Sequence, residues 1–145
     1  MRSISYMPQL LTVFVVSAAA AAQTPFGFPL DQRFVAISLN GRNYEAKSPT
    51  LTVRLDPNRN VLMGAGFAGC NTWNGRITLG DRQFAVDDLG TTKMFCADRM
   101  AAEAGFLDAL KSVTRWRMDG QKLVLDGAHA TLLLVPSEPA AGKKP

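Results

Sequence analysis

The sequence has few of the residues that most catalytic and metal sites use. Its 145 residues include one histidine, His129, and two cysteines, Cys70 and Cys96. A structural zinc site takes about four Cys or His ligands, so one chain cannot build such a site from this set. We therefore expect no metal ion.

The chain also has only a small excess of positive charge. The chain has 16 Lys and Arg against 12 Asp and Glu, which gives a net charge of +4 at pH 7. The basic residues are scattered, and no run of them is longer than the pair Lys143–Lys144. A nucleic-acid-binding protein gathers its cations on one face or along one helix, so we expect no nucleic-acid partner.

The strongly apolar stretch near the start of the chain is too short to span a membrane. Leu10–Val16 is apolar and leads to the run Ala18–Ala22, whereas a spanning helix needs about 20 apolar residues. Ala20 and Ala22 fit the A-x-A pattern that precedes signal-peptidase cleavage. We therefore predict that residues 1–22 are a signal peptide and that the protein is exported, periplasmic or secreted, with no membrane span after cleavage.

The remaining chain is expected to form one domain with flexible ends. Its composition, 47% hydrophobic and 19% charged, is typical of a globular protein, and the length is short for two domains. Residues 23–32 are rich in Pro and Gly and predict a linker, and residues 136–145 predict a flexible tail. The domain is then expected to cover residues 33–135.

Within this domain, short alternating stretches separated by turn residues predict strands. The clearest is Thr50–Asp56, in which every second residue is apolar. Asn40–Gly41 and Asp119–Gly120 predict tight two-residue turns, the latter of type I′. Thr131–Val135 is apolar on both faces, as in a central strand. The other stretches of this kind are Arg33–Leu39, Val61–Met63, Ile77–Leu79, Phe84–Val86, Arg115–Met118 and Leu123–Leu125.

One α-helix is expected, over about Arg99–Val113. This stretch is rich in Ala, Leu and Met and has no Pro, and Asp98 is placed to cap its N-terminus. Its apolar residues form one stripe for packing on a sheet. We therefore expect an α+β fold: a single small domain with an antiparallel sheet of six to eight short strands, wrapped around or covered by the helix.

The two cysteines are an even number in a chain expected to be exported, where disulfides persist. A Cys70–Cys96 disulfide is the favoured interpretation, and two free buried thiols are the alternative. Closing this loop would stabilise the fold by roughly 3–4 kcal/mol in the chain-entropy account. The chain has no C-x-x-C motif, so we expect the bond to be structural rather than redox-active.

Glycine and asparagine crowd the segment Gly64–Gly75. Such crowding indicates residues with positive φ or places where two chain segments approach closely. A phosphate-binding loop is not expected, because no Gly-Lys-[Ser/Thr] motif is present and no helix follows the glycines directly.

This segment and the residues after it resemble the META/HslJ-like family. Gly66, Gly69, Cys70, Asn71, Trp73 and Gly75 resemble its G-x-x-G-C-N-x-W-x-G signature, and Thr92, Met94 and Cys96 resemble its T-x-M-x-C element. Glu103, Phe106, Leu107 and Leu110 resemble its E-x-x-F-L-x-x-L helix, and Trp116, Leu123 and Leu125 its final hairpin. The similarity covers about Arg33–Val135. Ile77 stands where the family usually has Tyr.

The resemblance implies a small β-rich domain with one helix, found in exported or envelope-associated proteins. For bacterial members it also suggests a link to heat shock and antibiotic tolerance. It implies no established catalytic activity, cofactor or ligand. Any binding role of the family's Tyr hydroxyl is not expected here because of Ile77.

The inventory of reactive residues argues against catalysis, so we expect no catalytic residues. Any Ser/His/Asp or Cys/His mechanism would have to use His129, which lies in a turn, Asp126–Ala130. On a strand, the adjacent Asp87 and Asp88 would point to opposite faces; in a loop they would escape that objection, but such residues more often solvate or cap. Glu103 is expected to pair or form hydrogen bonds within the helix region rather than to act in a site.

We therefore expect a non-enzymatic, monomeric stress-response or binding module of the cell envelope, with an unknown protein or small-molecule partner. A place for Trp73 in the core is favoured over a role as an aromatic anchor. One alternative is an inhibitor that binds another protein through the Gly64–Gly75 loop. A second, less favoured alternative is a small hydrolase that uses His129.

Overall fold

The computed structural model describes residues 24–137. The predicted signal peptide and residues 138–145 of the predicted tail lie outside this range. Within residues 24–137, no helix has the length and apolar character needed to cross a bilayer.

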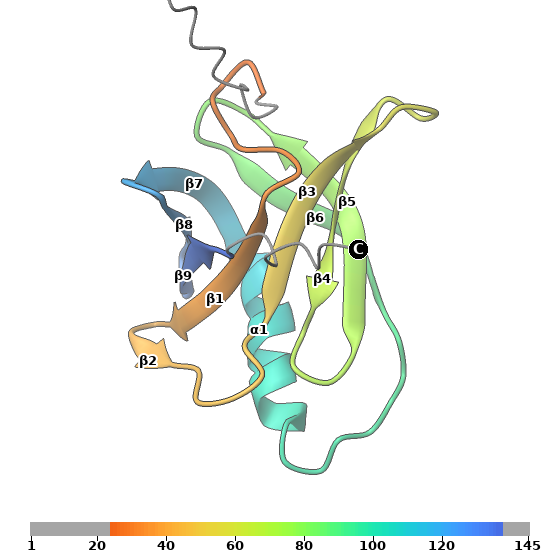
Figure 1. The fold of residues 1–145 in the computed structure, drawn as a ribbon, viewed down its shortest axis with the longest axis vertical. Coiled ribbons are helices and arrows are strands. Elements are labelled where there is room, and N and C mark those ends of the chain that lie inside the picture. Colours follow the sequence, from red (N-terminus) through yellow and green to blue (C-terminus); the bar gives the residue numbers. More distant parts are fainter. Residues whose placement is uncertain (1–23, 138–145) are drawn as a thin grey trace, which may run out of the picture.

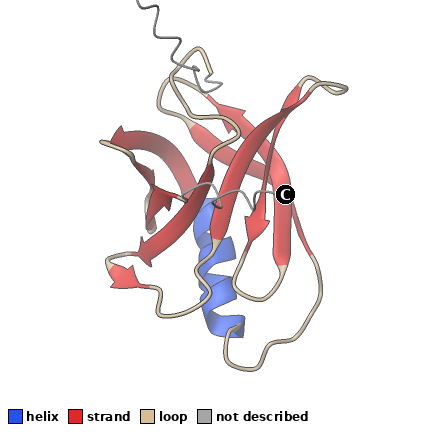
Figure 2. Cartoon of the chain, in the orientation of Figure 1, coloured by secondary structure: helices blue, strands red, loops and turns tan. Residues whose placement is uncertain are grey.

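Most of the described chain forms one antiparallel sheet (Figures 1 and 2). Eight strands follow the order β6-β5-β4-β3-β1-β9-β8-β7, and the two-residue β2 pairs with β1. The expected α+β domain is therefore present, dominated by the sheet, and β2 raises the strand number one above the expected range. The strands are β1 (Arg33–Leu39), β2 (Arg42–Asn43), β3 (Thr50–Asp56), β4 (Val61–Phe67), β5 (Thr72–Leu79), β6 (Phe84–Thr91), β7 (Val113–Asp119), β8 (Lys122–Gly127) and β9 (Thr131–Pro136).

The sheet curls until its two edge strands meet at one end. Trp116 of β7 donates its backbone N–H to the Arg82 carbonyl at 3.0 Å and its indole N–H to the Gly80 carbonyl at 3.1 Å. Gln83 and Arg115 form an isolated bridge beside these bonds. The sheet is therefore a half-barrel, closed by a few bonds next to the start of β6 rather than along a full strand.

The helix α1 (Met100–Ser112) connects β6 to β7 and lies beside the curled sheet (Figure 1). Its buried apolar residues, among them Phe106 and Leu110, belong to the core. Its N-cap residue is Arg99, and no side chain caps it, so the prediction that Asp98 caps the helix is wrong. The Arg99 N–H bonds to the Cys96 carbonyl, and the Arg99 carbonyl accepts the Glu103 N–H. This turn after Cys96 sets the start of the helix one residue later than a cap at Asp98 requires.

The segment Thr24–Gln32 belongs to the fold, in contrast to the expected linker. Phe28 is completely buried. Its ring centroid lies 6.1 Å from that of Phe84 and 5.1 Å from that of Trp116. Burial of a large aromatic side chain stabilises the fold enough to order this Pro- and Gly-rich segment. Residues before β1 therefore complete the core.

Two turn predictions have different outcomes. Asn40 and Gly41 have φ of 51° and 76°, as a type I′ turn requires. In the β7–β8 hairpin, Asp119 pairs with Lys122, and only Gly120 has positive φ. The turn residues are therefore Gly120 and Gln121, and a single positive φ at the first of them is the pattern of a type II′ turn rather than type I′.

Candidate functional site

The segment Gly64–Gly75 is a hairpin rather than the expected loop. It belongs to β4 and β5 except for the four connecting residues Ala68–Asn71, all of which are buried. A bond from the Ala68 N–H to the Asn71 carbonyl closes the turn. An inhibitor acting through this segment would have no exposed connecting loop, and the structure does not favour that alternative.

Close packing explains most of the glycines in this hairpin. A side chain at Gly66 would overlap the carbonyl of Thr50, and a Cβ at Gly64 would lie 2.7 Å from Cδ1 of Ile77. Among the motif glycines, only Gly69 has positive φ, at 129°. The pattern therefore reports close approaches inside the half-barrel, with one position that needs glycine for its backbone conformation.

Trp73 lies in the core, as the favoured interpretation predicts. It is 1% exposed, and its indole N–H donates to the Thr50 carbonyl at 3.0 Å. Its ring meets the Phe106 ring of α1 edge-on. Trp73 therefore links β5, β3 and the helix, and its ring is not available as an anchor for a partner.

Glu103 holds the hairpin to the helix. The residue as a whole is only 4% exposed. Oε2 accepts the backbone N–H groups of Cys70 and Asn71 at 2.8 and 2.6 Å, and Oε1 accepts Nδ2 of Asn71 at 2.8 Å. This confirms the prediction that Glu103 forms hydrogen bonds within the fold.

These bonds also set the charge state of Glu103. Burial raises its pKa, but the bonds from the Asn71 side chain, the Asn71 N–H and the Cys70 N–H lower it by more in sum. The pKa of Glu103 therefore lies below its ordinary value of 4.5, and the group is a carboxylate at neutral pH. A buried carboxylate that accepts three bonds is a structural acceptor rather than a proton donor or base.

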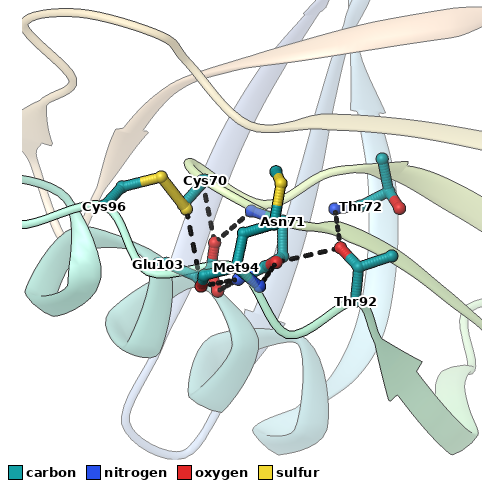
Figure 3. The surroundings of a disulfide bond; sticks show 7 residues. All are labelled: Cys70, Asn71, Thr72, Thr92, Met94, Cys96 and Glu103. Carbon is teal, nitrogen blue, oxygen red and sulfur yellow. Dashed lines mark hydrogen bonds between the residues drawn. A yellow bond between two sulfur atoms is a disulfide. The ribbon is translucent and has the colours of Figure 1, made fainter.

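The Asn71 side chain extends this network to the segment before the helix (Figure 3). Its Oδ1 accepts the Met94 N–H at 2.6 Å and the Thr92 hydroxyl at 2.9 Å, and its Nδ2 donates to the Met94 carbonyl at 3.0 Å. The Thr92 hydroxyl oxygen in turn accepts the Thr72 N–H. One buried amide therefore fixes both backbone polar groups of Met94.

The expected disulfide is present in the structure. It joins Cys70 to Cys96 with their Cα atoms 5.9 Å apart. We use the name latch for the disulfide together with Asn71 and Glu103. The latch joins the β4–β5 turn, the segment after β6 and the helix at one point.

Outside the latch, the side chains of Met94 and Phe95 face solvent, and we call these two residues the loop tip. Met94 is 60% exposed and Phe95 is 80% exposed, the highest fractions among the exposed large apolar side chains of residues 24–137. The backbone on both sides is fixed by Asn71 and by Cys96. A backbone held by hydrogen bonds on one side and a disulfide on the other thus presents two large apolar side chains to water.

A pocket of about 560 Å³ lies beside the start of α1. It is bounded on one side by Leu39 and the segment Arg42–Ala46, and on the other by residues from Asp98 to Gly105. Neither Trp73 nor Glu103 nor His129 lines it. The pocket therefore does not bring together the reactive residues that the sequence offers.

The remaining candidates are exposed and engaged in local contacts. His129 is exposed in its turn, and its carbonyl accepts Nδ2 of Asn40. Asp87 accepts the Thr78 hydroxyl, while Asp88 pairs with Arg76 at 3.1 Å.

The expectation that Asp87 and Asp88 point to opposite faces is wrong. Both contact outward-facing side chains of β5, because the β5–β6 pairing shifts register between Asn74 and Arg76 and Asp88 has a positive φ of 52°. A bulge of this kind re-aims a side chain. Within residues 24–137, no group of three or more His, Cys, Asp or Glu is placed to hold a metal ion.

Sequence reasoning missed two features, the exposed loop tip and the pocket. The signal for the first was Met94–Phe95 directly before a cysteine, an apolar pair in a segment with no strand or helix pattern. The pocket had no sequence signal, because its two walls are separated by some fifty positions in the chain.

A curled antiparallel sheet with one helix, fastened by a disulfide and a buried carboxylate, defines a small disulfide-stabilised β-rich domain. The family model of the META domain matches residues 29–139, and the chain belongs to this family. No curated protein matches the sequence.

Two solved structures share the fold. One is described as the NMR structure of the protein from Burkholderia xenovorans: it has 22% identity and a TM-score of 0.62, and the match covers 94% of this chain and 100% of the other. A second NMR structure has 22% identity and a TM-score of 0.53, with 72% of this chain and 87% of the other covered.

Proposed function

We propose that this META-domain protein is an exported, non-enzymatic binding module of the cell envelope that acts under stress and contacts a protein partner through its loop tip. One observation carries the proposal: Met94 and Phe95 are 60% and 80% exposed although the backbone beside them is fixed by Asn71 and the disulfide. Exposed aromatic and Met side chains are typical of interface centres.

Keeping two large apolar side chains in water has a free-energy cost. A large apolar side chain left in water forgoes roughly 1.5–3 kcal/mol of burial, and a flexible loop could fold such side chains inward. Here the latch holds the segment so that they stay outside. A partner that buries them does not have to order the loop, which is the advantage of a preorganised contact.

The loop tip is small, so its partner is expected to offer a concave apolar site. Two side chains supply far less than the roughly 800 Å² per partner of a standard protein interface. Such a contact works as an anchor, in which one or two residues fill a pocket and carry most of the binding energy. Lys93, exposed beside the tip, would lie at the polar rim.

The positions and contacts of the reactive residues support a non-enzymatic role. Cys70 and Cys96 share a disulfide, and Glu103 is enclosed by donors. His129 is exposed and does not line the pocket, which leaves the hydrolase alternative without a supporting observation. Export is supported by the leader pattern in residues 1–22 and by the disulfide, which persists in oxidising compartments.

The experiment is complementation of a deletion strain in the native host, with survival after heat shock and antibiotic exposure as readouts. We expect Met94→Ala/Phe95→Ala to lose complementation while its amount and unfolding midpoint match the wild type. The matched control is Leu55→Ala, because Leu55 is 50% exposed on β3, and we expect it to complement fully. Full complementation by the loop-tip variant would refute the proposed contact.

Export is tested separately on protein isolated from the native host. Mass spectrometry is expected to find the chain beginning at Gln23, with both cysteines resistant to alkylation until a reductant is added. An intact residue 1–22 segment together with two alkylatable thiols would refute export.

A further inference from the structure

The pocket beside α1 has the size and lining of a small-molecule site. Its volume of about 560 Å³ lies within the range of roughly 300–1,000 Å³ found for ligand pockets. One wall comes from the β1–β2 hairpin and the segment after it, and the other from Asp98, Arg99 and the first two turns of α1. Figure 1 shows β2 and the start of α1 at the same end of the molecule.

The apolar residues of the pocket lining, called the floor below, are small on the helix side. Ala101, Ala102 and Gly105 form the helix side, and Leu39 and the Tyr44 ring lie opposite. A Cβ at Gly105 would lie 3.7 Å from Cδ2 of Leu39, so a larger residue there would narrow the floor. The arrangement leaves room for an apolar group between helix and hairpin.

Tyr44 adds an unused donor at this wall. Its hydroxyl is buried and has no hydrogen-bond partner within residues 24–137. An unpaired buried hydroxyl is destabilising by about 1–3 kcal/mol relative to a paired one. A carbonyl on a bound molecule would supply the acceptor only if the Tyr44 side chain changed rotamer, because the hydroxyl is buried.

The rim carries two cations and two anions, Arg42, Arg99, Glu45 and Asp98. Within the described residues none of these four takes part in an ion pair, since the salt bridges join other residues. Unpaired charges of both signs around an apolar floor complement a molecule that carries both signs and an apolar body.

We propose that this pocket binds a zwitterionic small molecule with an apolar body, of which a short peptide with free ends and apolar side chains is the simplest form. The site goes beyond the proposed function and does not rest on the loop tip. Because the pocket is open and its rim solvated, the affinity is modest, with a Kd on the order of 0.1–1 mM.

The probe is the dipeptide Leu-Leu, titrated into the ¹⁵N-labelled protein and followed by NMR. We expect saturable shifts at the backbone amides of Asn43–Ala46 and Ala101–Gly105, while amides on β7 and β8 stay unchanged. Gly-Gly, which lacks the apolar body, and N-acetyl-Leu-Leu-amide, which lacks both charges, are each expected to bind at least tenfold more weakly. No saturable shift with Leu-Leu up to several millimolar would overturn the proposal, and equal binding of the uncharged analogue would overturn its zwitterionic character.

A matched pair of helix variants separates this pocket from the rest of the surface. Ala102→Leu places a larger side chain in the pocket, whereas Ala104→Leu adds the same atoms at an exposed position of α1 outside the pocket lining. We expect Ala102→Leu to weaken Leu-Leu binding at least tenfold and Ala104→Leu to leave it within twofold. If Ala102→Leu binds Leu-Leu as tightly as the wild type, the proposed pocket is not the binding site. This outcome does not depend on whether the loop tip is functional.

Discussion

The latch and the loop tip lie within a few residues of each other and are used in opposite ways. Asn71 is 3% exposed and joins three separate chain segments by hydrogen bonds, whereas Phe95 is 80% exposed. One region stabilises the fold, and the other gains a fixed position from that stability. One family motif can therefore include both a buried residue that holds the fold together, such as Asn71, and an exposed residue that does not pack in the core, such as Met94.

The largest effect should come from the core beneath the latch. We expect Trp73→Ala to destabilise the protein by about 3–5 kcal/mol, because it leaves a cavity and removes the bond to the Thr50 carbonyl. Urea unfolding followed by Trp116 fluorescence measures it, and Trp73→Phe should lose less. A Trp73→Ala variant as stable as the wild type would contradict the assignment of Trp73 to the core.

Removing the disulfide should give the second-largest loss of stability. Cys70→Ala/Cys96→Ala is expected to cost roughly 3–4 kcal/mol through the lost cross-link. Urea unfolding with and without a reductant checks this: the reductant should destabilise the wild type by a similar amount and leave the double variant unchanged. If the fully reduced wild type keeps its midpoint, the disulfide does not stabilise the fold.

The buried carboxylate should give a smaller effect that depends on pH. Because the pKa of Glu103 is lowered in the fold, its stabilising contribution is complete above its ordinary value of 4.5 and is lost as the pH falls through the lower folded value. Glu103→Gln places a side-chain NH₂ group, itself a donor, near the N–H donors of Cys70 and Asn71. It should therefore lower the free energy of unfolding by about 1–3 kcal/mol at pH 7. We expect this cost to shrink at pH 3 in urea unfolding.

The control for this experiment is Asp108→Asn, an exposed carboxylate on the same helix. It should change the stability by less than about 0.5 kcal/mol at pH 7. A Glu103→Gln effect that is equally large at pH 3 and pH 7 would show that the carboxylate charge is not what holds the hairpin.

The loop tip should give the smallest effect on stability. Phe95→Ala removes an exposed side chain, so the free energy of unfolding is expected to stay within about 0.5 kcal/mol of the wild type. Thermal unfolding measures it, with Phe28→Ala as a buried comparison that should lower the midpoint strongly. A large loss on Phe95→Ala would mean that this side chain packs within the fold and is not a contact surface.

The parts of the fold set by local pattern could be predicted from the sequence. The ranges of β1 and β3 agree with the alternation of apolar residues, and β9 lies between β1 and β8 as its two apolar faces indicated. Both termini of the helix lie within one residue of their expected positions. Periodicity suffices here because each element buries one face, or both, against the same core.

The parts set by contacts between distant segments could not be predicted. Phe28 lies in a Pro- and Gly-rich stretch whose composition indicates a linker, and only its contacts with Phe84 and Trp116 reveal its place. The Asn71 bonds to Met94 and Glu103 span more than twenty residues. The sequence could suggest that these residues matter through the family resemblance, but not which atoms meet.

The pairing of β1 with β9 has a consequence for when this protein can fold. The two strands lie side by side in the middle of the sheet, yet they stand near opposite ends of the chain. Long separation between contacting strands slows folding, and a nascent chain that still lacks β9 has no partner for one side of β1. The sheet therefore reaches its native pairing only after β9 has been synthesised, so the first half of the chain cannot complete the fold by itself.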